Sequence, residues 1–376
     1  MNPLSKLTSF VEKRWYGKAG VLVLLAPLEY LFKLIASRRK QRLLRRQVRA
    51  SVPVIVVGNL TVGGTGKTPT IIALVEFFQS KGLNPAVISR GYGRQLKQTE
   101  DALQHVTRAS KVEAVGDEPL LIFESTGCEV VVSTDRLAAI TYIEQNTACD
   151  LVLADDGLQH YQMGRDKEIV VIDRSRLFGN EHLLPVGPLR EPLSRLQSVD
   201  WVLLVGDVPV GENTYNGDGE TLRVLAQSSK ITYLAEIRPV GLTQISTGIT
   251  FSLDALLNWR KIMAVAGLGN PHKFFNLLRQ VIEFKELNLY GKVFQLREKT
   301  FADHHPYSIA DFDSEADEVV VMTSKDAVKC RRFAKDSWYQ LDIKMVLAPE
   351  FLAQVLDSIH PNSTQHSNDQ TENQSP

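Results

Sequence analysis

Short runs of apolar residues, each bounded by turn residues, recur through the first half of the chain. We expect strands over Val54–Val57, Ala86–Ser89, Glu129–Ser133, Leu151–Ala154, Ile169–Ile172 and Trp201–Val205. Helical patterns lie between several of them, most clearly over Lys67–Lys81, Glu118–Glu124 and Asp135–Gln145. Near-continuous apolar strands that alternate with helices are typical of a parallel sheet covered on both faces. The pattern therefore predicts a doubly wound α/β domain over residues 51–225.

The pattern changes after this domain. Two strand-like segments, Thr232–Ile237 and Leu242–Ser246, flank the sequence Arg238-Pro239-Val240-Gly241. Pro and Gly between two such segments favour a reversal of the chain. We therefore predict a β-hairpin linker over residues 229–250.

A second, smaller α/β domain is predicted over residues 251–360. Its strands are expected at Ile262–Ala266 and Val319–Thr323, with a helix over Lys273–Ile282. Residues 361–376 are polar, which predicts a disordered tail.

Charge is distributed unevenly, although the formal net charge of the 376 residues is zero. Residues 1–50 hold twelve Lys or Arg against Glu12 and Glu29, so the rest of the chain carries an excess of acids. A basic front end on an acidic body predicts attachment to an anionic surface. The chain has only three cysteines and no CxxC pair, so neither a disulfide framework nor a structural zinc site is expected, and a reducing cytoplasm fits.

The N-terminal 50 residues are predicted to associate with a membrane. Val21–Ala26 is apolar, but Pro27, Glu29 and Lys33 interrupt the run short of the ~20 residues that a span needs. No small-residue cleavage site follows, so a signal peptide is not predicted. Seven basic residues do follow, at positions 38, 39, 40, 42, 45, 46 and 49. This combination favours a helix that lies in the headgroup layer, although an ordinary capping helix with a solvated basic face has the same pattern. Nucleic acid is not expected as a partner, because aromatic residues are not interleaved with the bases.

The strongest chemical signal is a glycine-rich loop between a predicted strand and a predicted helix. It consists of Val62, Gly63, Gly64, Thr65, Gly66, Lys67 and Thr68. Backbone N–H groups of such a loop can surround phosphate oxygens at the N-terminus of the following helix. Lys67 can neutralise the β and γ phosphates of ATP, and the Thr68 hydroxyl can bind Mg²⁺. Thr61 replaces the first glycine of the common motif.

Several acidic residues and one histidine are candidates for chemistry. Asp155 and Asp156 follow a predicted strand, where acids can hold Mg²⁺ directly or through water, although a pair of acids there could instead cap the next helix. Asp117 begins another predicted helix and could be a simple N-cap. His304 and His305 are adjacent in a loop, and no third ligand at metal spacing accompanies them.

Seven motifs, in order along the chain, resemble the tetraacyldisaccharide 4′-kinases of lipid A synthesis. They are Pro53–Pro69, Ser89–Arg94, Gly116–Pro119, Asp155–His160, Leu184–Pro192, Gly267–Pro271 and Phe301–His304. The resemblance runs from about residue 15 to 332, so it covers most of the chain. Leu158 stands where an aromatic residue is common, and Ser324 stands where Glu is expected, so no catalytic role is assigned near Ser324.

The resemblance implies an enzyme bound to the cytoplasmic face of the inner membrane, with two α/β domains joined by a β-hairpin. It implies transfer of the γ-phosphoryl group of ATP to the 4′-hydroxyl of a tetraacylated glucosamine disaccharide 1-phosphate. An Asp–His pair that activates the hydroxyl maps onto Asp117 and His304, with Asp155 or Asp156 on the metal. The expected substrate-binding residues are Arg136, Gln159, Arg190 and Glu191. No obligate protein partner is evident.

Two other functions compete with this one. The loop is also similar to that of membrane-associated partitioning ATPases, but those carry a lysine where this chain has Val62. Such a switch protein would hydrolyse ATP without an acceptor. A non-catalytic nucleotide-binding adaptor would bind ATP without turnover.

Overall fold

The computed structural model describes residues 3–94, 103–206, 232–286, 294–315 and 317–359. The predicted end of the first domain near residue 225 and the predicted tail at 361–376 lie outside the described residues.

The first unit is a parallel sheet with helices on both faces, as the sequence predicts. Its strands are ordered β7 (Trp201–Val205), β6 (Lys167–Asp173), β1 (Val54–Gly58), β5 (Leu151–Asp155), β2 (Pro85–Ser89) and β4 (Glu129–Ser133), with β3 (Leu103–His105) antiparallel at the edge. The five residues of β1 are all buried, which accounts for the continuous apolar run. The doubly wound α/β fold is therefore confirmed.

Helices on opposite faces of this sheet form two separate cores. Helices α3 (Lys67–Ser80) and α5 (Asp117–Thr126) bury Ile71 and Leu120 on one face, and the short α4 (Val112–Val115) precedes α5. Helix α6 (Arg136–Asn146) buries Ile140 on the other face, where the short helix η2 (Leu193–Ser198) also packs.

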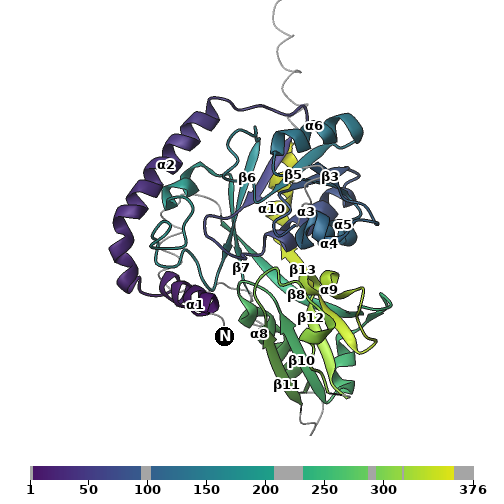
Figure 1. Cartoon of the computed structure of the whole chain (residues 1–376). Helices are drawn as coiled ribbons and strands as arrows, with labels where there is room; N and C mark the ends of the chain where they lie inside the picture. The colour runs from purple at the N-terminus through teal and green to yellow at the C-terminus, as the bar shows by residue number, and fades with distance from the viewer. Residues whose placement is uncertain (1–2, 95–102, 207–231, 287–293, 316, 360–376) are drawn as a thin grey trace, which may run out of the picture.

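The second unit contains a smaller parallel sheet. Its strands are β10 (Lys261–Ala266), β11 (Gln295–Thr300), β12 (Val319–Thr323) and β13 (Trp338–Leu347), and its helices are η3 (Leu253–Asn258), α8 (Pro271–Glu286), η4 (Ile309–Asp311) and α9 (Ser324–Cys330). The long antiparallel pair of β13 and β8 (Thr232–Gln244) connects it with β7, so both units share one continuous sheet (Figure 1).

The predicted chain reversal at Arg238–Gly241 is wrong. Strand β8 continues through Pro239 without a turn, and the chain reverses after Gln244 instead, where β9 (Thr250–Phe251) pairs back onto β8. The register of β8 against β13 shifts between Pro239 and Gly241, so that Val240 has no opposite residue. Such a bulge tolerates a proline in a strand because it interrupts the ladder of hydrogen bonds.

The end of the predicted second domain packs on the first unit. Helix α10 (Pro349–Ile359) buries Phe351, Val355 and Ile359 in the same core as Ile71 of α3. The Phe351 ring also meets Trp201 of β7 edge to face, with the ring centroids 6.0 Å apart. The last helix of the predicted domain 251–360 therefore belongs to the core of the first unit.

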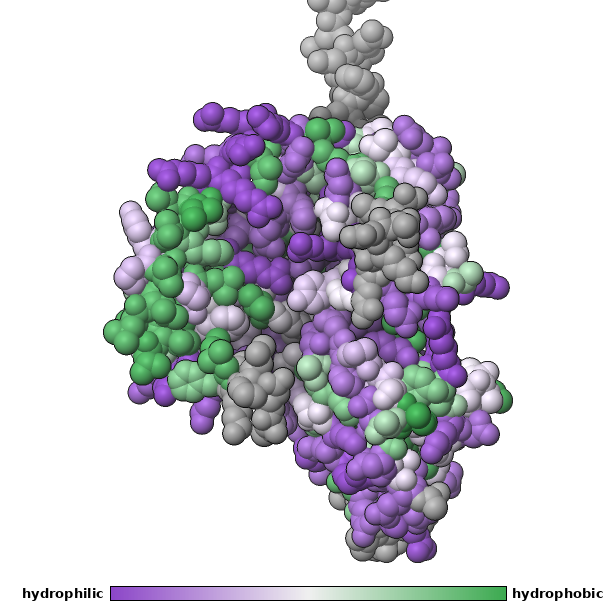
Figure 2. Space-filling model, viewed as in Figure 1, coloured by the Kyte–Doolittle hydropathy of each residue, from purple (hydrophilic) through white to green (hydrophobic). Residues whose placement is uncertain are grey.

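An N-terminal arm lies along one side of the first unit (Figure 1). It consists of α1 (Pro3–Trp15), η1 (Gly20–Leu25) and α2 (Ala26–Leu44). The 25-residue helical stretch Gly20–Leu44 is long and apolar enough to cross a membrane by length and composition, in contrast to the prediction that the apolar run is too short. Figure 2 shows apolar residues gathered on its outer surface, and only 6% of the most apolar window is buried.

The arm is nevertheless attached to the protein body by polar contacts. The Glu29 carboxylate accepts a hydrogen bond of 2.7 Å from the Leu183 backbone N–H and lies 3.0 Å from His182 Nδ1. Lys40 Nζ lies 3.7 Å from Glu191 and over the ring of Tyr161. These contacts hold α2 against the body.

Candidate active site

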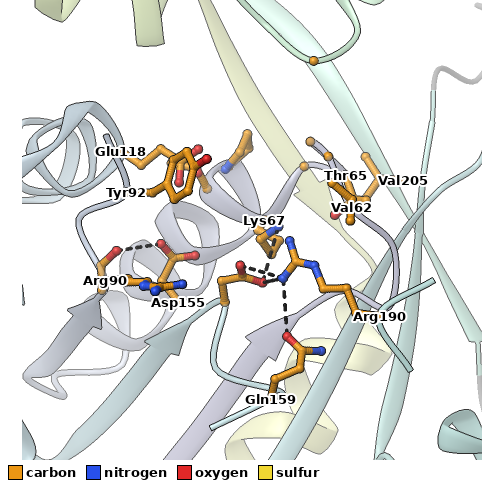
Figure 3. A pocket seen from close by; sticks show the side chains of 18 of the residues that line it. Val62, Thr65, Lys67, Arg90, Tyr92, Glu118, Asp155, Gln159, Arg190 and Val205 are labelled. Carbon is orange, nitrogen blue, oxygen red and sulfur yellow. Dashed lines mark hydrogen bonds and ion pairs between the residues drawn. The ribbon is translucent and has the colours of Figure 1, made fainter. Parts of the chain in front are cut away.

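A cavity of about 1170 Å³ extends from the N-terminal arm to the second unit. Its walls come from α2, the glycine-rich loop, the end of β5, and the loops before α8 and after β11. Figure 3 shows the polar side chains that gather in it. Such a position, at the carboxyl ends of parallel strands, is where α/β proteins bind ligands.

The glycine-rich loop lines this cavity over its whole predicted length, Val62–Thr68. Gly63 and Gly66 have φ angles of 111° and 95°, which side chains other than glycine rarely adopt. Lys67 Nζ donates a 3.2 Å hydrogen bond to Asn59 Oδ1 and lies 3.7 Å from Asp156 Oδ1. The loop thus presents a lysine and the N-terminus of α3 to the same space.

Asp155 is the last residue of β5, Asp156 follows it, and the two have opposite electrostatic surroundings. Asp155 is 2% exposed and accepts a 2.9 Å hydrogen bond from Ser89 Oγ. Burial, together with Glu118 and Asp156, raises the pKa of Asp155 to about 7. Burial also opposes ionisation of Asp156, but Lys67 and Arg190 outweigh it and lower the pKa of Asp156 to about 2. The φ of 49° at Asp156 is strained for a residue with a side chain.

These residues fit a magnesium ion accompanied by phosphates. The Oδ1 atom of Asp155 is buried without a hydrogen-bond partner, an arrangement that a cation would satisfy. Thr68 lines the same cavity. Among the residues that the structure describes, no three His, Cys, Asp or Glu side chains form a metal cluster of their own. Magnesium does not need one, because it is usually held by one or two carboxylates, waters and substrate phosphates.

Asp117 and His304 come from different units and meet beside the cavity, which His304 lines. His304 Nδ1 lies 3.0 Å from both carboxylate oxygens of Asp117. Asp117 is the first residue of α5, whose N-cap is Gly116, so it is not the N-cap that the simpler prediction makes it. Burial opposes the charge of Asp117, but the hydrogen bond from His304 and the charge of Lys325 outweigh it and lower the pKa of Asp117. His304 itself has a φ of 58°, a strained conformation that the surrounding structure must hold.

Three of the four predicted substrate-binding residues form one polar network on the cavity wall. Arg190 Nη1 donates hydrogen bonds to Asp156 Oδ2 at 2.9 Å and to Gln159 Oε1 at 3.4 Å (Figure 3). Gln159 Nε2 donates to Glu191 Oε1 at 3.0 Å. Glu191 also accepts a hydrogen bond from the Tyr161 hydroxyl.

Arg136 does not join this network. It is 3% exposed, and its guanidinium donates hydrogen bonds to the backbone carbonyls of Ser133 at 2.9 Å and Asp155 at 3.0 Å. Burial lowers the pKa of Arg136 to about 10. Its donors are directed at the ends of β4 and β5 and it is not among the residues that line the cavity, so its contact with substrate stays a prediction.

The sequence interpretation missed several residues of the site. Lys325 Nζ lies 2.8 Å from Glu118 and 3.0 Å from Asp303, so it connects the two units beside the Asp117–His304 pair. Burial lowers the pKa of Lys325, but the surrounding carboxylates outweigh it and raise the pKa. Lys325 directly follows Ser324, near which no catalytic role is assigned from the sequence, and its charge is the signal that could have identified it. Asn59, the partner of Lys67, directly follows strand β1 and has no distinctive motif of its own.

Comparison with known proteins identifies this combination of features. Residues 21–360 match the family model for LpxK, the tetraacyldisaccharide-1-P 4′-kinase. Relatives named tetraacyldisaccharide 4′-kinase include one from Francisella philomiragia, 38% identical over 89% of this chain and 99% of the relative, and one from Alcanivorax borkumensis, 40% identical over 94% and 98%. The crystal structure of LpxK from Aquifex aeolicus, described as a complex with ATP, superposes with a TM-score of 0.70 at 26% identity over 90% of this chain and 100% of that chain. This chain therefore belongs to the tetraacyldisaccharide-1-P 4′-kinase family.

Proposed function

We propose that this protein is the kinase that transfers the γ-phosphoryl group of ATP to the 4′-hydroxyl of a tetraacylated glucosamine disaccharide 1-phosphate in lipid A biosynthesis. Membership of the family supports the reaction. The observation that carries the mechanism is that the phosphate loop of one unit and His304 of the other line a single cavity, with Asp117 buried 3.0 Å from His304. Transfer requires a nucleotide and an acceptor hydroxyl in the same space.

The nucleotide is held by the loop Val62–Thr68. Its backbone N–H groups surround the phosphates, and Lys67 exchanges its contact with Asn59 for the β and γ phosphate oxygens. Thr68, Asp155 and Asp156 would hold Mg²⁺, which would neutralise charge on the phosphates. Because phosphoryl transfer has a loose transition state, these positive charges and their placement account for most of the catalysis.

The acceptor hydroxyl is oriented by Asp117, with His304 as its support. The lowered pKa keeps Asp117 ionised, so its carboxylate accepts a hydrogen bond from the hydroxyl and receives the proton late in the transfer. His304 Nδ1 donates to that carboxylate and maintains its orientation. Asp117 and His304 come from different units, so the pair forms only where the two units pack together.

The sugar headgroup lies against the wall formed by Gln159, Arg190 and Glu191, which faces the N-terminal arm. The acyl chains remain in the membrane, beside the exposed apolar side chains of the helical stretch Gly20–Leu44. The basic residues after position 37 favour an anionic leaflet, and the ATP requirement favours its cytoplasmic face.

One assay tests the proposal. Purified protein is incubated with Mg-ATP labelled in the γ-phosphate and with tetraacyldisaccharide 1-phosphate in detergent micelles. We expect labelled 4′-phosphorylated product and little phosphate release without the acceptor. Phosphate release that does not depend on the acceptor, with no labelled lipid, would instead support a switch ATPase.

A further inference from the structure

The residue that follows α1 contacts the phosphate loop directly. The Tyr16 hydroxyl donates a 2.9 Å hydrogen bond to the backbone carbonyl of Val62, which is 46 positions further along the chain. The same hydroxyl is the nearest atom to the place where a Cβ on Gly63 would stand, at 3.8 Å. Tyr16 also lies just before the apolar stretch Gly20–Leu44, so it connects the N-terminal arm to the nucleotide site.

This hydrogen bond determines how one peptide group of the loop is oriented. The bond between Val62 and Gly63 is trans, because Leu184–Pro185 is the one cis bond in the described residues. In a planar trans peptide, the C=O and the following N–H point in opposite directions. A hydroxyl that holds the Val62 carbonyl therefore directs the Gly63 N–H away from the arm. Gly63, at φ 111°, has no side chain to restrict rotation of the Val62–Gly63 peptide. Without the Tyr16 hydroxyl, the two opposite orientations of this peptide would therefore differ less in energy.

Tyr16 is itself held in place by the loop before Arg190. The guanidinium carbon of Arg176 lies 4.4 Å from the centroid of the Tyr16 ring. The Asn180 N–H donates a 2.7 Å hydrogen bond to the Trp15 carbonyl, and Trp15 Nε1 donates to the Pro185 carbonyl at 3.1 Å. Burial raises the pKa of the Tyr16 phenol even against the charge of Arg176, so the hydroxyl remains a donor at neutral pH.

The other side of the phosphate loop is attached to the same segment. The Val62 N–H donates a 2.9 Å hydrogen bond to the Pro188 carbonyl, two residues before Arg190. Val62 is therefore bonded at its N–H by the segment before Arg190 and at its carbonyl by the N-terminal arm. A residue held on both sides has little freedom to rotate, which matters where N–H groups must meet phosphate oxygens.

We propose that Tyr16 is a positioning residue that orients the phosphate loop and makes nucleotide affinity depend on the docked N-terminal arm. The inference rests on the proposed role of the loop in binding ATP. Tyr16 does not touch substrate in this arrangement and acts through the Val62–Gly63 peptide.

The test is Tyr16→Phe, which removes the hydroxyl and leaves the ring over Arg176. The control is Tyr30→Phe, because Tyr30 lies on the same arm but is 71% exposed. In the same micelles, we expect Tyr16→Phe to raise the Kd for a non-hydrolysable Mg-ATP analogue and the KM for ATP by about three- to ten-fold, the effect of one lost hydrogen bond. The KM for the lipid acceptor, vesicle binding and Tm should match the Tyr30→Phe control.

Nucleotide affinity equal to that of wild type in Tyr16→Phe would overturn the inference. A lower Tm with unchanged nucleotide affinity would also overturn it, because the hydroxyl would then only support the fold. These outcomes are separate from the fate of the proposed function, which depends on whether the wild-type protein binds ATP and phosphorylates the lipid.

Discussion

Asp117 and His304 are 187 positions apart in the chain, and His304 Nδ1 nevertheless lies 3.0 Å from each carboxylate oxygen of Asp117. The pair is supported by Lys329, whose Nζ lies 3.7 Å from Asp117 Oδ2, and by Tyr92, whose ring centroid is 4.9 Å from that of His304. Charged groups that are this well buried and paired are found at functional sites more often than elsewhere. The arrangement makes the pair the centre of the predictions below.

Asp117→Ala and His304→Ala should each lower kcat by about 10²- to 10⁴-fold. The double variant should be little worse than the more damaging single variant, because residues that act as one unit lose their effect together. The measurement is kcat for both singles and the double under saturating ATP, with Tm as the control for folding. Losses that multiply in the double variant would argue against a shared function.

Asp117 should also make stability depend on pH. Its folded pKa lies below its unfolded value of about 3.9, so its ionised form stabilises the fold above that pH, and this stabilisation is lost as the pH falls through the lower folded pKa. The advantage in unfolding free energy of wild type over Asp117→Asn should therefore shrink as the pH falls below 4. Urea unfolding of both proteins at pH 6, 5, 4 and 3 measures it. An advantage that is constant across this range would contradict the lowered pKa.

Lys67→Ala should reduce phosphoryl transfer by at least about a hundred-fold while the protein stays folded. Lys67 is partly exposed to the cavity and is paired with Asn59 and Asp156, so its removal affects a polar site and not the apolar core. The measurement is product formation at saturating acceptor, with circular dichroism to check the fold. Normal turnover in a folded variant would rule out the phosphate-loop assignment.

The exposed apolar face of the N-terminal arm should determine membrane binding. Leu24 is 82% exposed, and Val21 and Leu28 are 57% and 52% exposed. The triple change of these residues to Ser should weaken binding to anionic vesicles by at least about ten-fold, because each apolar side chain contributes to insertion. ATP affinity should be unchanged, because Tyr16 remains in place.

Sedimentation with vesicles at two salt concentrations tests this, because the basic part of the arm is screened by salt. Ile249→Ser is the matched control, since Ile249 is 55% exposed but lies in the second unit. The point changes are preferable to deletion of the arm, which would also remove the Tyr16–Val62 hydrogen bond. Vesicle binding as strong as that of the control would exclude this face as the membrane contact.

Arg136→Met should lower stability and leave recognition of the lipid unchanged. The substitution leaves the carbonyls of Ser133 and Asp155 without their buried donors, at a cost of about 1–3 kcal/mol of unfolding free energy. Arg190→Met is the contrasting variant. Because Arg190 lines the cavity, this substitution should raise the KM for the acceptor. Denaturant unfolding and acceptor KM at low temperature separate the two. A raised acceptor KM in Arg136→Met at normal stability would support its predicted contact with substrate.

Local features of the sequence predict much of this protein. The six parallel strands of the first unit are predicted within one or two residues, because a strand buried on both faces must be apolar throughout, whereas the antiparallel edge strand β3 is not predicted. The phosphate loop is predicted for a similar reason. Its glycines, its lysine and its threonine are neighbours in the chain, so their spacing alone brings them to the start of α3.

Other features depend on residues that are distant in the chain. Pro239 is accommodated within β8 because the register against β13 shifts there and leaves Val240 unpaired, and no local pattern indicates that partner strand. Arg136 has the same local sequence signal as a substrate-binding arginine, but the ends of β4 and β5 enclose it. Helix α10 returns to the first core because the apolar surface it covers is there.

The geometry of the site also depends on residues that are distant in the chain. The family resemblance singles out Asp117 and His304 as a pair. Only the continuous sheet brings them within hydrogen-bond distance. The same holds for Lys325 with Glu118 and for Tyr16 with Val62. The sequence by itself determined the strands and the phosphate loop, because neighbouring residues decide both. The tertiary structure alone decided which side chains meet across the cavity, because those distances follow from how the two units and the arm pack together.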